Sequence, residues 1–185
     1  VALFLEKYIP LAEECLQKGL TPVFPPLQPG GDYWDTAFLR LSLLRLKEKN
    51  ATSVLNSLML STYCWTYGHT LDWGAGGPEC WPSSTPYNTP ENSQDQQGFH
   101  TYEWYQAHVK AVLDKTVPIL LLEAGRSAEC GLASSSLTLE NQSATVQAIL
   151  EQLYGQESSN SAEDNTSDML PEEIKICNFL VDLDW

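Results

Sequence analysis

Aromatic and acidic residues close or follow four apolar segments of the chain, at residues 21–26, 57–65, 117–123 and 174–181. Aromatic rings stack on the flat C–H faces of sugar rings, while carboxylates and imidazoles form hydrogen bonds with sugar hydroxyls. Together these residue types favour a carbohydrate ligand. The candidate binding residues are Asp32, Trp34, Trp65, Tyr67, His69, Trp73 and Trp185, and the candidate catalytic residue is Glu123.

Metal, nucleotide and serine-hydrolase chemistry find little support in the sequence. His69, His100 and His108 have no metal-ligand spacing to one another, and there is no Cys-x-x-Cys pair. The glycine-rich residues 74–77 match neither common phosphate-binding motif, and no Gly-x-Ser-x-Gly motif occurs. We therefore expect no metal and no cofactor, and we expect the five cysteines to be ordinary buried thiols.

The net charge of −14, from 24 acidic and 10 basic residues, limits the classes of partner. Nucleic acids and anionic membrane surfaces both require a basic face, so neither is expected to bind. No apolar run approaches the roughly 18 residues needed to span a membrane. A neutral or cationic ligand is therefore favoured, and the sequence leaves the compartment open.

Helices are predicted between the four apolar segments, which read as strands. Apolar residues recur at helical spacing, and end signals such as Gly19, Asn50 and Gly155 follow them. Strands that alternate with helices pair in parallel through right-handed crossovers, which predicts the α/β class with the four strands adjacent in chain order. The predicted helices cover residues 3–18, a run capped by Asp35 that ends near Asn50, residues 99–115 and residues 138–154.

The chain is interpreted as one α/β domain over residues 1–185, or as part of a barrel. Two stretches fall outside the alternating pattern. A loop from residue 66 to about 97 is long enough that a functional role is expected. Residues 155–170 are rich in Ser, Asn and acids, and a mobile acidic loop is expected there.

Three strand motifs resemble the later strands of the (β/α)8-barrel glycoside hydrolases related to cellulases and mannanases. The motifs are Thr21-Pro-Val-Phe-Pro-Pro, Leu60-Ser-Thr-Tyr-Cys-Trp-Thr-Tyr and Pro118-Ile-Leu-Leu-Leu-Glu-Ala-Gly. The resemblance implies that the chain corresponds to the second half of a TIM barrel. It also implies that Glu123 matches the nucleophile of these retaining enzymes, while the acid/base glutamate would lie before Val1.

Retaining hydrolysis requires two carboxyl groups about 5–5.5 Å apart, so the chain taken alone is expected to be incomplete as an enzyme. Asp32 or Asp35 could supply a second carboxyl or could serve as a helix cap. Three functions remain open: a hydrolase-like domain that acts on a β-linked glycan, a non-catalytic carbohydrate-binding homologue, and a small α/β domain that binds a protein partner. Open strand edges at 21–26 and 174–181 also predict self-association.

Overall fold

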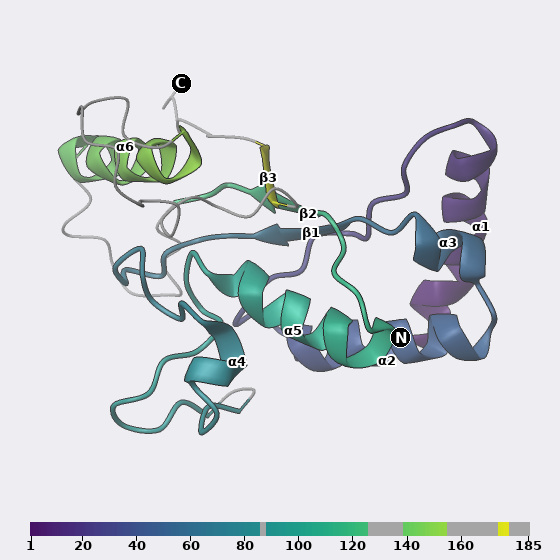
Figure 1. Cartoon of the computed structure of the whole chain (residues 1–185), viewed down its shortest axis with the longest axis horizontal. Coiled ribbons are helices and arrows are strands. Elements are labelled where there is room, and N and C mark those ends of the chain that lie inside the picture. The colour runs from purple at the N-terminus through teal and green to yellow at the C-terminus, as the bar shows by residue number, and fades with distance from the viewer. Residues whose placement is uncertain (86–87, 126–138, 155–173, 178–185) are drawn as a thin grey trace, which may run out of the picture.

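The computed structural model describes residues 1–85, 88–125, 139–154 and 174–177. Helices and strands alternate through most of this part of the chain (Figure 1), which confirms the α/β class. Residues 155–170 and Trp185 lie outside the described residues. The elements are helices α1 (Ala2–Gln17), α2 (Asp35–Glu48) and α3 (Thr52–Asn56), strand β1 (Leu60–Tyr63), helices α4 (Gly77–Cys80) and α5 (Thr101–Leu113), strand β2 (Ile119–Leu122), helix α6 (Leu139–Tyr154) and strand β3 (Ile174–Cys177).

The three strands form one parallel sheet in the order β1-β2-β3, as the sequence predicted. In the register of the sheet, Thr62 lies beside Leu121, which in turn lies beside Ile176. Strands β1 and β2 are shorter than the apolar segments that predicted them, and residues 178–181 of the last segment lie outside the described part. The parallel pairing brings the ends of the strands to one edge of the sheet, here called the carboxyl edge.

The prediction of a regular strand at residues 21–26 is wrong, because prolines interrupt it. The segment does run beside β1 in the predicted parallel direction, through isolated bridges at Val23 and Leu27. The Phe24 amide donates to the Met59 carbonyl at 2.7 Å, and the Leu27 amide donates to the Ser61 carbonyl at 3.1 Å. Three of the intervening and flanking residues are prolines, which have no N–H to donate, so a continuous ladder cannot form.

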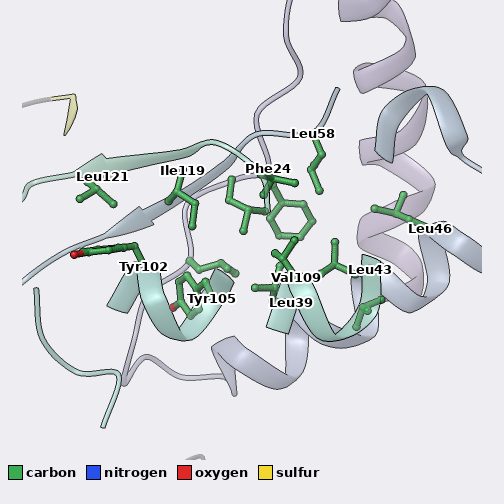
Figure 2. Packing of buried hydrophobic residues seen from close by; sticks show 14 of the residues in the cluster. Phe24, Leu39, Leu43, Leu46, Leu58, Tyr102, Tyr105, Val109, Ile119 and Leu121 are labelled. Carbon is green, nitrogen blue, oxygen red and sulfur yellow. The ribbon is translucent and has the colours of Figure 1, made fainter. Parts of the chain in front are cut away.

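The hydrophobic core lies between the sheet and the helices α2 and α5, which run side by side beneath it (Figure 1). Leu39, Leu43 and Leu46 recur at helical spacing along α2 and are fully buried. On α5 the same spacing buries Tyr105 and Val109. Figure 2 shows how side chains from both helices meet Phe24 and the strand residue Ile119. Burial of this apolar surface fixes the sheet on the helix pair.

The long connection between β1 and α5 is ordered by tryptophan side chains. Trp104 donates its indole N–H to the Gly74 carbonyl at 2.9 Å, and Trp81 donates to the Ala75 carbonyl at 2.9 Å. Gly74 has a φ of +77°, and a Cβ there would lie 2.4 Å from the Asp95 carbonyl oxygen. Only glycine fits such a position. Trp81, within the loop, and Trp104, on α5, therefore pack the loop. In the described residues, no helix is long and apolar enough to cross a membrane.

Candidate functional site

Glu123 lies immediately after β2, at the carboxyl edge of the sheet. Its side chain is half-buried, and Trp65 donates its indole N–H to the Glu123 carboxylate (Oε2) at 2.8 Å. The two residues meet because parallel pairing of β1 and β2 brings their ends together. Glu123 is therefore partly recessed and in contact with an aromatic residue of the segment that follows β1.

An aromatic row continues from Trp65 in both directions along its own segment. Tyr63 and Trp65 are stacked, with ring centroids 4.9 Å apart and an interplanar angle of 25°. Tyr67 meets Trp65 edge to face at 5.9 Å, and its hydroxyl donates to the Pro29 carbonyl. The two ring contacts join the three side chains into one row, and Trp65 at its centre contacts Glu123. Tyr63 covers one face of the Trp65 indole.

Among the described residues, positive φ values occur at one end of this row and at the glutamate that contacts its centre. Five residues other than glycine have positive φ values, and three of them are Asn50, Asn92 and Asp114, types that tolerate this conformation. The other two are Tyr67 (φ 52°) and Glu123 (φ 49°). Bulky side chains rarely adopt such values, and strained residues of this kind cluster at functional sites.

His69 and Trp73, both predicted as binding residues, form a second cluster inside the loop. Their rings stack with centroids 3.8 Å apart and an interplanar angle of 6°. The Trp73 indole donates to the Asp95 carboxylate at 3.2 Å. Partial burial lowers the pKa of the His69 imidazole, and the nearby Asp95 carboxylate opposes that shift. These residues stack on each other, so the Trp73 face toward His69 is unavailable to a ligand.

The acids after segment 21–26 occupy different environments. Asp32 is exposed, and so is the neighbouring Trp34 at 59 %. Asp35 is fully buried instead, where the Tyr105 hydroxyl donates to its carboxylate at 2.6 Å and the Gln96 amide approaches at 3.4 Å. The expectation that Asp35 caps the following helix is wrong, because Trp34 holds the cap position without a side-chain hydrogen bond and Asp35 begins the helix.

Burial raises the pKa of the Asp35 carboxyl, while hydrogen bonds from Tyr105, the Thr36 backbone and Gln96 act to lower that pKa. The carboxylate oxygens already accept hydrogen bonds from core residues, one to each oxygen. Asp35 is therefore a core residue and does not present a second catalytic carboxyl to a ligand.

The cysteines and histidines add no metal centre to the described part of the chain, where no group of three or more His, Cys, Asp or Glu could hold an ion. His100 instead contacts Glu103, with Nδ1 and Oε1 2.6 Å apart. The expectation of buried thiols holds for Cys64, whose pKa is raised by burial. It is wrong for Cys80, which is exposed, and for the partly exposed Cys15.

Sequence reasoning missed Tyr63 as a site residue, because it lies inside an apolar segment and was read as part of a buried strand. The signal that would have found it is the spacing of Tyr63 and Trp65, because alternate residues of an extended segment lie on the same side and these two rings stack. Pro29 carries no side-chain signal for its role, since its backbone carbonyl makes the contact with Tyr67.

Comparison of the chain with protein families, with curated proteins and with solved structures finds no match in any of the three. The resemblance to (β/α)8 glycoside hydrolases therefore stays a prediction from the sequence. An assignment of function depends on the geometry of Glu123 and the aromatic row beside it.

Proposed function

We propose that this chain binds a β-linked glycan at the carboxyl edge of its sheet, along the row Tyr63, Trp65, Tyr67 and against Glu123. The observation that carries the proposal is the hydrogen bond from the Trp65 indole to the Glu123 carboxylate, because it holds an aromatic ring and an acceptor group side by side. A sugar presents an apolar C–H face and polar hydroxyls within one ring, and this pair of residues complements both.

Backbone strain supports a functional role for the same residues. Tyr67 and Glu123 both have left-handed backbone conformations that cost free energy, of the order of 1–2 kcal/mol each. Such a cost persists where the side-chain position matters for function. The fold adds further support, because ligand sites in parallel α/β sheets lie at the carboxyl ends of strands.

A second candidate function is hydrolysis of the glycan, with Glu123 as nucleophile in a domain related to half of a TIM barrel. The position of Glu123 directly after a parallel strand favours it. Retaining hydrolysis also needs an acid/base carboxyl about 5–5.5 Å away, and Asp35 is enclosed in the core. We therefore expect this chain alone to bind its glycan without efficient turnover.

Titration calorimetry with β-linked glucose and mannose oligosaccharides tests the proposal. We expect binding by the native chain and a loss of at least about tenfold in affinity for Trp65→Ala, as for a central aromatic anchor. Trp65→Phe, which retains a ring but removes the N–H donor to Glu123, is expected to have an intermediate effect. Failure of every oligosaccharide to bind, or an unchanged affinity of Trp65→Ala, would contradict the proposal.

Trp81→Phe is the matched control, because it also removes one indole hydrogen bond from a half-buried tryptophan, but that bond goes to the Ala75 carbonyl and not to Glu123. Its affinity should equal that of the native chain. Turnover is measured separately with an activated aryl glycoside. Efficient hydrolysis that Glu123→Gln abolishes would establish the second candidate in place of binding alone.

A further inference from the structure

Helix α2 carries apolar residues on both of its faces. One is the core face, whose leucines are fully buried against the sheet. On the other side Leu41 is 50 % exposed and Leu44 is 38 % exposed, although a helix that covers a sheet normally presents polar residues to solvent. Trp34, which is also exposed, holds the cap position seven residues before Leu41. The outward face of α2 therefore has an apolar line of its own.

The residues of this line follow the spacing of a coiled-coil seam. Trp34, Ala37, Leu41 and Leu44, here called the α2 seam, are separated by three, four and three positions, which are successive a and d positions of a heptad. Ala37 is partly exposed. At 1.5 Å per residue the α2 seam is about 15 Å long. A narrow line with this spacing fits the apolar face of another helix.

Basic side chains lie on both sides of the α2 seam. At 100° per residue, Arg40 projects on the side of Leu44, and Arg45 projects on the opposite side, next to partly buried Phe38. Arg45 pairs with Glu48 at 2.5 Å, and Arg40 makes no ion pair within the described part of the chain. The exposed charges of α2 are three basic and one acidic, in a chain whose net charge is −14.

We propose that the α2 seam docks an acidic amphipathic helix of a protein partner. The apolar face of that helix covers Leu41 and Leu44, and its acidic flanks face Arg40 and Arg45. The α2 helix of a second copy does not satisfy these contacts, because its flanking positions carry the same arginines and like charges would face each other. The proposal uses no residue of the aromatic row, so it does not rest on the proposed function.

Two designed helical peptides test the proposal. Both have leucine at the a and d positions of three heptads, and they have either glutamate or lysine at the flanking e and g positions. Fluorescence anisotropy measures the binding of each labelled peptide to the full chain, at nanomolar peptide so that the peptides stay monomeric. We expect the glutamate peptide to bind about tenfold more tightly or better, although the net charge of −14 attracts the lysine peptide at long range.

Paired leucine variants locate the binding surface. Leu41→Gln with Leu44→Gln removes the apolar contacts and keeps residues of good helix propensity, and we expect a loss of about tenfold in affinity for the glutamate peptide. Leu3→Gln with Leu11→Gln is the matched control, because these leucines of α1 are more exposed still, at 71 % and 64 %. Its affinity should stay within twofold of the native chain. Urea denaturation checks that both variants fold.

Charge reversal and oligomeric state complete the test. Arg40→Glu with Arg45→Glu should make the lysine peptide the tighter ligand. Equal affinity of the native chain for the two peptides, an unchanged preference in the reversal variant, or equal effects of the two leucine pairs would overturn the proposal. Sedimentation velocity tests the second copy: a native dimer that Leu41→Gln with Leu44→Gln dissociates would assign the α2 seam to self-association and overturn the partner helix.

Discussion

The backbone conformation of Glu123 can be tested by its effect on stability. Its φ of 49° is left-handed, where a Cβ costs about 1–2 kcal/mol. Glu123→Ala and Glu123→Gly both remove the carboxylate that Trp65 contacts, so the two variants differ mainly in their tolerance of this conformation. Glycine adopts the left-handed conformation freely, at a cost of about 0.5–1 kcal/mol in backbone entropy.

We therefore expect Glu123→Gly to be more stable than Glu123→Ala by about 0.5–1 kcal/mol in free energy of unfolding, the net of the two terms. Urea denaturation measures the difference, provided that the dependence on urea concentration is the same for both variants. Glu48 is the matched control, because it is an exposed glutamate in the last turn of α2. There the order should reverse, with Ala more stable than Gly by up to about 1 kcal/mol.

A result in which Glu123→Ala equals or exceeds Glu123→Gly in stability would refute the reasoning, because the residue would then not occupy a strained conformation. Glycan binding gives the second readout. Glu123→Gly should lose affinity even where it gains stability relative to Ala, because the site needs the carboxylate. A variant that is more stable but binds less well is the expected result where a strained backbone conformation serves function.

Three further predictions concern the core, the loop and the sheet edge. Because burial raises the folded-state pKa of Asp35, the stability that it contributes is present below the ordinary Asp pKa and is lost as pH rises through the raised value. The test is the midpoint of urea denaturation, measured at a series of pH values. In Asp35→Asn this midpoint should no longer fall as pH rises through that range. Gly98→Ala should lower the free energy of unfolding by about 1–3 kcal/mol, because the new Cβ would lie 2.8 Å from the Trp73 ring. Pro25→Thr combined with Pro26→Thr should increase self-association in sedimentation velocity, because both residues would gain an N–H at the sheet edge.

Each of these predictions has a control and an outcome that counts against it. Asp32→Asn changes an exposed carboxyl and should leave the pH dependence intact, whereas an unchanged dependence in Asp35→Asn would contradict the first prediction. Gly31→Ala meets only the flexible Gln28 side chain and its carbonyl at 3.2–3.4 Å, so a smaller effect is expected than at Gly98. If the double proline variant associates no more than the native chain, the prolines do not protect that edge.

The order of the elements could be predicted from the sequence, because hydrophobic spacing is a local property. The run Leu39, Leu43, Leu46 specifies one buried face of a helix wherever that helix packs, and the apolar residues 119–122 specify a strand. Alternation of the two then requires parallel pairing. The same local pattern predicted a regular strand at residues 21–26, which is wrong. The segment is apolar, but its prolines interrupt the ladder of hydrogen bonds.

The contacts of the site were decided by the tertiary structure. Trp65 and Glu123 are 58 positions apart, and they meet only because β1 and β2 pair in one register. Asp32 and Asp35 are the same residue type, three positions apart. Asp35 is nevertheless buried against Tyr105, whereas Asp32 is exposed. Burial of a carboxyl depends on which distant side chains pack around it, and residue type and spacing along the chain do not contain that information.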